Sequence, residues 1–248
     1  MSAGIQIQDV LDEQRISRSL EQLGLGKYCV QVLPTVDSTN SYVMQHLEQL
    51  PGYAVVIADR QTHGRGCYNK QWSSDAGVDL LTSILFYVPL KCNYSSWPLM
   101  MALAVNRTLK HFGIENYIKW PNDICLNDTT KISGILLESG IKDHKRFIIV
   151  GIGIDNPTLF ARETLLLTLL QQIEHIITEY HASGNILLLQ EALNNCIHYQ
   201  RHIGIYQNDV LIASGKHIGF DPSGAVLIDD GQQVRAYASG TLRFEVIN

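Results

Sequence analysis

The chain has 248 residues, of which 46% are hydrophobic and 17% charged, and its formal net charge is −5. This length allows one large domain or a medium domain with a small one, and the composition is that of an ordinary globular protein. The negative balance and the lack of a long basic run argue against a DNA- or RNA-binding protein, because such proteins usually carry a basic patch. No apolar stretch reaches about 18 residues, so no membrane-spanning helix is predicted.

Cysteine usage and the N-terminus indicate the compartment. The cysteines are odd in number and none forms a C-x-x-C pair, so neither a disulfide framework nor a zinc site is indicated; they are Cys29, Cys67, Cys92, Cys125 and Cys196. Met1–Gln14 contains acidic residues and no apolar run, unlike a secretory signal peptide. We therefore expect reduced thiols and a cytoplasmic protein.

The first elements are expected around a polar tetrapeptide. Residues 1–29 form a helical lead-in, because Ile7–Leu23 has apolar residues at helical spacing and ends at glycines. Val30–Val36 predicts a strand, and Asp37-Ser38-Thr39-Asn40 then offers N-cap residues for a helix to about Leu47. The later strands are expected at Tyr53–Ala58, Asp79–Val88, Tyr117–Trp120, Asp123–Leu126, Lys131–Glu138 and Arg146–Ile154, and the helices at Trp97–Phe112, Phe160–His181 and Ile186–Tyr199.

The pattern changes after about Arg201. Short strand-like runs are separated by turn residues, and they are Asp209–Ala213, Lys216–Phe220, Ala225–Ile228, Gln233–Tyr237 and Thr241–Val246. Closely spaced short strands favour a small barrel. The predicted fold class is therefore α+β, with a mixed sheet and helices in a domain over residues 30–200 and a small all-β domain over 201–248.

Three polar segments next to apolar strands could carry chemistry. In Gln61-Thr62-His63-Gly64-Arg65-Gly66, glycines allow close backbone approach and Arg65 can bind a phosphate or carboxylate with two hydrogen bonds. The segment is not a Walker A loop, and such a loop alone is more often a solvated turn. The other two segments are Lys119-Trp120-Pro121-Asn122-Asp123, and Lys131–Glu138 followed by Gly151-Ile152-Gly153-Ile154. Glycines inside apolar strands indicate bulges or close backbone approach, although plain sheet packing explains most of them.

The order of these motifs resembles the biotin protein ligase family. The resemblance rests on Asp37–Asn40, Gln61–Gly66, Trp72, K-W-P-N-D, K-x-x-G-I-L-x-E and G-I-G-I, and it runs from about Val30 to Ile154. It resumes weakly near Gly219-Phe220-Asp221 and Ser239-Gly240. The resemblance implies a class II synthetase-like biotin/lipoate ligase catalytic domain and a C-terminal SH3-like β-barrel.

The resemblance also implies a ligand set. The biotin-binding residues are expected to be Ser38, Thr39, Asn40, Gln61, Arg65, Gly66, Cys67 and Lys119. The nucleotide-binding residues are expected to be Arg65, Trp72, Asn122 and Lys131. The family's catalytic lysine corresponds to Lys119, and Arg65 is expected to assist it. The expected ligands are biotin, ATP and Mg²⁺, with the Mg²⁺ held mainly by ATP phosphates and no metal site in the protein.

The implied reaction has two steps. The biotin carboxylate attacks the α-phosphate of ATP, and the Lys119 ammonium offsets the repulsion between the two anions. A neutral amine of an acceptor lysine then attacks the biotinyl-adenylate, and Asp123 is a candidate to help, although a structural role in the turn explains it better. The acceptor implied by the family is a biotin carboxyl carrier domain, such as that of acetyl-CoA carboxylase, and a homodimer is a further expectation from the family.

The loop after Arg65 departs from the family pattern. The family usually continues G-R-G-R-x-G-R, whereas this chain has Cys67, Asn69 and Lys70 at the second arginine, the next glycine and the last arginine. Losing a guanidinium removes a permanently charged clamp with fork geometry. Two hypotheses follow: the adenylate leaks, or Tyr68 and Cys67 rebuild the closure. A nucleophilic role for Cys67 is disfavoured, because His63 is the single base beside it.

Three other functions remain open at the level of sequence. A lipoate or octanoate ligase on the same fold would need a long apolar tunnel and would lack K-W-P-N-D. A degenerate biotin- or adenylate-binding protein would explain the altered loop but not the retained Lys119, Arg65 and Gln61. A metal hydrolase is the weakest alternative, because the nine histidines are scattered. About thirty residues precede Val30, too few for a winged-helix domain, so no DNA-binding role is expected.

Overall fold

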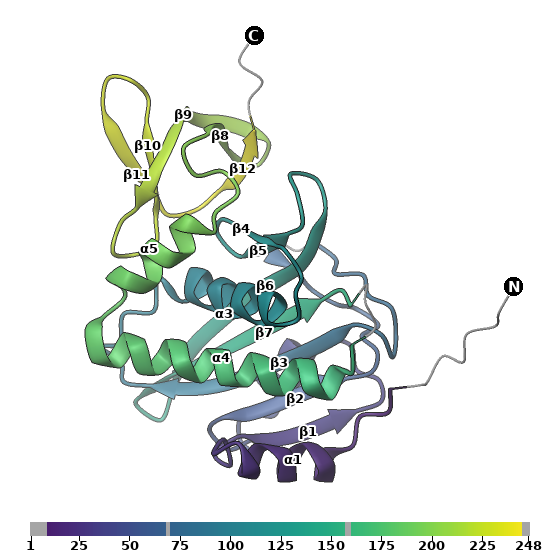
Figure 1. Ribbon diagram of the computed structural model, residues 1–248. Coiled ribbons are helices and arrows are strands. Elements are labelled where there is room, and N and C mark those ends of the chain that lie inside the picture. Colours follow the sequence, from purple (N-terminus) through teal and green to yellow (C-terminus); the bar gives the residue numbers. More distant parts are fainter. Residues whose placement is uncertain (1–8, 68–69, 157–159, 245–248) are drawn as a thin grey trace, which may run out of the picture. The chain divides into compact units, whose positions relative to one another are not determined.

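The computed structural model describes residues 9–67, 70–156 and 160–244, and the chain divides into two compact units. The first unit contains the chain up to Leu90 together with Leu136–Leu170, and the second contains Lys91–Ile135 and the chain from Gln171 onward. Figure 1 labels helices and strands. Strand β6 (Lys131–Lys142) and helix α4 (Arg162–Ser183) each contain residues of both units. The domain boundaries expected at residues 30 and 200 stay a prediction.

A mixed sheet forms the centre of the first unit. Its strands β1 (Cys29–Leu33), β2 (Ala54–Ala58), β3 (Leu80–Val88) and β7 (Lys145–Ile154) lie side by side in that order, and β6 follows β7. β1 and β2 are parallel, whereas β2 with β3 and β3 with β7 are antiparallel. All five residues of β2 are buried, as expected for a strand with both faces covered. The predicted α+β class with a mixed sheet is confirmed.

Two helices flank the strands of this unit. α1 (Glu13–Gln22) begins after Asp12, whose side chain caps the helix by accepting from Arg15 N at 2.9 Å. The helix predicted from Ile7 therefore begins later in the described residues, because the cap at Asp12 fixes its first turn. α2 (Thr39–Gln45) packs Val43 onto the sheet, in a core cluster that also contains Ala54, Val56, Leu85, Phe147 and Ile149.

The second unit contains helices α3 (Trp97–His111) and α5 (Ile186–Asn194) and the short strands β4 (Tyr117–Lys119) and β5 (Asp123–Cys125). β4 pairs with β5, and β5 pairs with the first residues of β6. The predicted helix Ile186–Tyr199 is too long. It ends at Asn194 because the next segment pairs as a bridge with β4, at Cys196 and Ile118. No helix among the described residues is long and apolar enough to cross a membrane.

A five-stranded antiparallel sheet completes the second unit. Its order is β11-β10-β9-β8-β12, with bounds Val234–Tyr237, Val226–Asp229, Val210–Phe220, His202–Gln207 and Thr241–Phe244. This sheet is compatible with the expected SH3-like barrel. Two details of the prediction were wrong: β8 was missed, and the two strands expected at 209–213 and 216–220 are one strand, β9. Gly215 is not a turn residue there, because a Cβ on it would lie 2.4 Å from Asp229 O of the neighbouring strand.

Candidate active site

The tetrapeptide Asp37–Asn40 lies beside the polar loop that follows β2. The parallel pairing of β1 and β2 continues as a bridge from Val36 to Gln61, which places Thr39 against the Gln61 side chain. Thr39 N donates to Gln61 Oε1 at 2.7 Å, and Thr39 Oγ1 lies 3.1 Å from the same oxygen. The sequence-predicted residues Ser38, Thr39 and Asn40 are all buried, and Gln61 is half-buried.

Small residues on β3 and β7 make room for this polar group. Ser83 of β3 is paired directly with Gly151 of β7, and a Cβ on Gly151 would lie 2.3 Å from Asn40 Oδ1. Two residues further on the same face, a Cβ on Gly153 would lie 2.6 Å from Trp72 Cε2. The expectation of close approach at these glycines is confirmed, and here the approaching groups are the Asn40 and Trp72 side chains.

A hydrogen-bond network fixes the Asn40 amide. Ser83 Oγ, which is fully buried, lies 2.6 Å from Asn40 Oδ1 and 2.7 Å from Thr39 Oγ1. Asn40 Nδ2 donates to Leu136 O at 3.3 Å and to Glu138 Oε2 at 2.9 Å. Both Nδ2 hydrogens are thus used within the protein. The geometry makes Asn40 a support that holds Glu138 and the α2 start in place.

Two polar groups of the cluster remain open. Neither the Ser38 hydroxyl nor Gln61 Nε2 hydrogen-bonds to any residue that the structure describes. Ser38 occupies the N-cap position of α2 but makes no side-chain cap hydrogen bond. Neither atom is among the buried side-chain atoms that lack a hydrogen bond, and a hydroxyl and an amide nitrogen that are not fully buried can pair with a polar ligand.

Arg65 forms an ion pair with Glu138 in the same unit. Its Nη1 and Nη2 donate to the two carboxylate oxygens at 3.0 and 2.8 Å. The Arg65 side chain is 42% exposed, so the guanidinium remains accessible to a ligand anion, which would compete with Glu138. Gly66 and Cys67 follow in the loop and are half-buried. Tyr68 and Asn69, on which part of the loop hypothesis rests, lie outside the described residues.

The other predicted site residues belong to the second unit. Lys119 ends β4 with a half-buried side chain, and it forms no salt bridge within the described ranges. Asn122 Nδ2 donates to Ile135 O at 2.5 Å, and Asn122 O accepts from Ile135 N at 2.9 Å. Lys131 pairs with Asp123 at 2.6 Å. Asn122 and Asp123 therefore brace the K-W-P-N-D turn, which supports the structural interpretation of Asp123.

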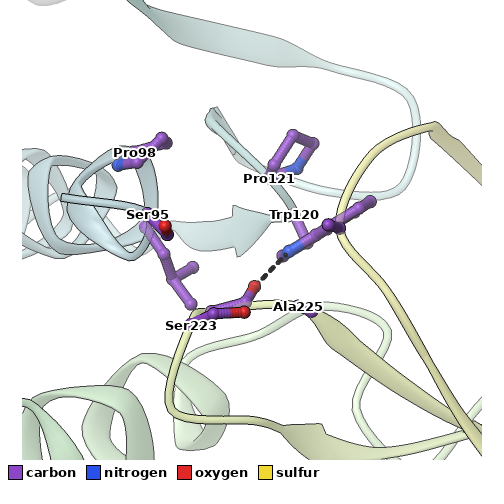
Figure 2. Close-up of a pocket in the computed structure, with 9 residues that line it drawn as sticks. Ser95, Pro98, Trp120, Pro121, Ser223 and Ala225 are labelled. Atoms are coloured by element: carbon purple, nitrogen blue, oxygen red, sulfur yellow. Dashed lines mark hydrogen bonds between the residues drawn. The ribbon is translucent and has the colours of Figure 1, made fainter. Parts of the chain in front are cut away.

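Trp120 anchors this turn to the C-terminal part of the chain. Its indole Nε1 donates to Gly224 O at 2.8 Å, and Figure 2 shows the ring reaching toward the turn that carries Ser223 and Ala225. Its backbone N donates to His198 Nε2 at 3.0 Å. A cavity of about 160 Å³ lies beside the ring, lined in part by Pro98 and Pro121. This volume is below the roughly 300–1,000 Å³ of typical small-molecule pockets.

Two residues with a structural part in the site, Ser83 and Glu138, were not predicted as such. Both complete the polar network through their contacts with Asn40. A signal existed for Ser83, because Thr82-Ser83 interrupts an otherwise apolar strand. Glu138 was part of a recognised motif, but sequence alone did not indicate that it would contact Arg65 and Asn40.

One group of potential metal ligands occurs among the residues that the structure describes. It consists of Cys196, His198 and His217, whose ligand atoms lie within 4.8 Å of one another. Nitrogen and sulfur ligands do not suit Mg²⁺, which prefers oxygen. The expected Mg²⁺ therefore fits better on ATP phosphates than on this cluster. Burial raises the pKa of the Cys196 thiol to about 12, so the thiol is protonated at neutral pH.

The buried side chains of His198 and His217 predict that the fold loses stability at acid pH. Burial lowers the pKa of His217 to about 4, and burial, with repulsion from His217, lowers the pKa of His198 well below its ordinary value. Between pH 6.5 and about 4 the unfolded chain binds the extra proton, so stability is lost as the pH falls. We expect the free energy of unfolding to drop by about 1.4 kcal/mol per pH unit from His217 alone.

Denaturant unfolding at several pH values in this range measures how the free energy of unfolding changes with pH. His217→Asn should flatten this dependence, whereas replacing the exposed His175 by glutamine should leave it unchanged. An equal slope in all three proteins would contradict the neutral state of His217.

The mixed sheet and its buried polar cluster define an α+β fold, and comparison with known proteins gives its family. The family model described as "Biotin/lipoate A/B protein ligase family" matches residues 32–155, half of the chain. The chain belongs to this family. The matched segment includes the tetrapeptide, the Gln61–Gly66 loop, the K-W-P-N-D turn and the glycines of β7.

Individual relatives are biotin protein ligases. The chain is 26% identical over 238 residues to the bifunctional ligase/repressor BirA of Escherichia coli, covering 86% of this chain and 73% of that protein. It is 30% identical over 183 residues to the human biotin–protein ligase, covering 69% of this chain and 23% of that protein. A solved biotin protein ligase from Aquifex aeolicus, in complex with biotin and ATP, is 25% identical, with a TM-score of 0.74 over 87% of this chain and 99% of that chain.

Proposed function

We propose that this chain is an ATP-dependent ligase that forms biotinyl-5′-adenylate and transfers biotin to a lysine of a biotin carboxyl carrier domain. Two findings support the ligase class: membership of the family, and relatives that include an Aquifex ligase in complex with biotin and ATP. The observation that carries the proposal for this chain is the pair of open polar groups, Ser38 Oγ and Gln61 Nε2, in a buried cluster.

The open groups match the chemistry of biotin. The ureido ring offers a carbonyl acceptor and two N–H donors, so a hydroxyl and an amide nitrogen can pair with it. Thr39 holds the Gln61 amide oxygen through two contacts, which leaves Nε2 directed to a ligand. Ser83 Oγ contacts both Thr39 Oγ1 and Asn40 Oδ1, and so holds Thr39 in place. We assign ureido recognition to Ser38 and Gln61, with Thr39 and Asn40 as their supports.

The charges of the reactants indicate which residues act in the adenylation step. The biotin carboxylate and the α-phosphate of ATP repel each other, and a cation between them lowers the barrier to their reaction. Lys119 has an ammonium without a salt-bridge partner in the described chain, and Arg65 has an accessible guanidinium, so these two groups are assigned to that charge. Trp72, Asn122 and Lys131 are assigned to the nucleotide, directly or through the turn. Mg²⁺ on the phosphates supplies additional charge neutralisation for pyrophosphate departure.

The residue at position 67 is expected to affect the rate at which the biotinyl-adenylate is released. We expect Cys67→Arg to slow biotinyl-adenylate release by about 10- to 150-fold, because a guanidinium restores a charge-assisted contact to the phosphate worth about 1.5–3 kcal/mol. The release of labelled adenylate from the purified protein, followed over time, measures the dissociation rate. Cys67→Ser, which adds no charge, is the matched control and should release as fast as the unaltered protein. Equal rates for Cys67→Arg and the unaltered chain would refute the leak hypothesis in favour of rebuilt closure.

Transfer of labelled biotin tests the proposal as a whole. The unaltered chain, ATP, Mg²⁺ and a biotin carboxyl carrier domain should give a covalently labelled carrier, and replacing the carrier's target lysine should abolish the label. Adenylate formation without labelling of the carrier would restrict the function to the first step. Sedimentation of the same preparation tests the proposed homodimer. Because the reaction consumes ATP, we place it in the cytoplasm.

A further inference from the structure

A buried group of titratable side chains connects the K-W-P-N-D turn to the C-terminal sheet. Cys196 and His198 lie in the segment after α5, and His217 lies in β9. Their exposed fractions are 7%, 1% and 0%. None of these residues belongs to a motif of the predicted site, so their role requires a separate explanation.

The hydrogen bonds of the group fix where each proton lies. A backbone N–H is always a donor, so Trp120 N, at 3.0 Å, donates to a lone pair on His198 Nε2. A neutral His198 then carries its hydrogen on Nδ1, which lies 3.0 Å from His217 Nδ1. His217 accepts there and donates from Nε2 to Gly219 O at 3.1 Å. Cys196 Sγ also lies 3.3 Å from His198 Nδ1 and 3.5 Å from its Nε2. With both rings neutral, each ring nitrogen has a partner of the right kind.

This proton order disfavours metal binding. His198 has one lone pair in its neutral form, and the Trp120 N–H uses it. A metal on His198 Nδ1 would require removing the proton that this nitrogen donates to His217, which would break the hydrogen bond between the two rings. The cluster is therefore better explained as a chain of oriented hydrogen bonds that ends at the Trp120 peptide.

The Trp120 peptide is the backbone next to Lys119. On the other side of Lys119, Ile118 N donates to Asn195 O at 2.9 Å and Ile197 N donates to Ile118 O at 3.0 Å. The residues before and after Lys119 are thus both tied to the segment 195–198. Such bracing restricts the rotation of the backbone from which the Lys119 side chain projects.

We propose that His198, oriented by His217, is a positioning residue that holds Lys119 for the adenylation step. This inference rests on the proposed function, because Lys119 must act in adenylation for its placement to affect the rate. His198 touches no reacting group; it acts through the Trp120 peptide. Without the His198 acceptor, the Trp120 N–H keeps only the Cys196 sulfur, a weaker acceptor, and the peptide is held less firmly.

The test separates positioning from simple loss of stability. We expect His198→Leu to lower kcat of biotin-dependent ATP–pyrophosphate exchange roughly 10- to 100-fold, the effect of about 1 Å of misplacement, with KM for biotin within about twofold. His198→Gln should recover most of kcat, because the glutamine Oε1 reaches about as far as the imidazole Nε2 and accepts from Trp120 N. Ile203→Val, a change in the buried core of β8, is the stability control and should leave kcat unchanged.

Different results overturn different claims. Equal kcat in His198→Leu and the unaltered protein, or no rescue by His198→Gln in a folded variant, would overturn the positioning role. Nitrogen NMR of histidine-labelled protein reports the tautomer independently of activity: a hydrogen on His198 Nε2, or a stoichiometric bound metal in the purified protein, would also overturn it. If the unaltered chain shows no exchange with biotin, the proposed function fails instead, and the tautomer spectrum still decides the hydrogen-bond order.

Discussion

Lys119→Ala is expected to lower kcat of biotin-dependent ATP–pyrophosphate exchange by about 10²–10³-fold, the cost of removing one charge-stabilising group from an active site. The Lys119 ammonium forms no salt bridge among the described residues, so its charge is not already neutralised by a carboxylate. Biotin binding should persist, because ureido recognition is assigned to Ser38 and Gln61. Exchange kinetics and calorimetry with biotin measure the two effects separately.

Two variants control this experiment. Lys119→Arg keeps the charge but changes its geometry, and it should recover only part of the rate, because guanidinium and ammonium groups are not interchangeable at a fixed site. Lys216→Ala removes an exposed lysine from β9 of the same unit and should leave kcat unchanged. A kcat for Lys119→Ala within twofold of the unaltered value would remove Lys119 from the mechanism.

Gly151→Ala is expected to weaken biotin binding by about tenfold or more. The added Cβ would lie 2.3 Å from Asn40 Oδ1, a distance that forces one of the two groups to move. Asn40 cannot move alone, because its amide also contacts Ser83 and Glu138. Overpacking of this kind costs about 1–3 kcal/mol, and the displaced groups are those that support Thr39 and Gln61.

Calorimetric titration with biotin measures the effect of Gly151→Ala. Gly219→Ala is the matched control, since it is also a strand glycine but its Cβ would meet Leu227 Cδ1 at an ordinary 3.6 Å. That variant should bind biotin with unchanged affinity. Unchanged affinity in Gly151→Ala as well would mean that the Asn40 network does not support the biotin site.

The sequence best predicted the groups of residues that lie in short motifs. Ser38, Thr39 and Gln61 were recognised from short motifs, and the structure places them together because parallel pairing extends from β1 and β2 to Val36 and Gln61. The strands that hold them were predicted to within a few residues, because their apolar runs are continuous. Lys119, Asn122 and Lys131 were likewise recognised as a motif, and their catalytic or binding roles stay a proposal.

Features that depend on tertiary contacts could not be read from the sequence. The contact of Arg65 with Glu138 joins residues that are far apart in the chain, and the relay through His198 and His217 joins two more such segments. The prediction divided β9 into two strands, whereas β9 is continuous through Gly215, on which a Cβ would lie 2.4 Å from Asp229 O of the neighbouring strand β10. In each case the deciding neighbour lies outside the local sequence window.

Exchange of labelled pyrophosphate into ATP, with biotin, lipoate or octanoate supplied in turn, tests the central claim most directly. It requires no acceptor protein, and it reports the carboxylate that the chain activates. The proposed function predicts exchange with biotin and none with the other two acids. Exchange with lipoate or octanoate but not with biotin would assign the chain to another activity of the same family, and no exchange with any of the three would leave a ligand-binding protein without adenylation activity.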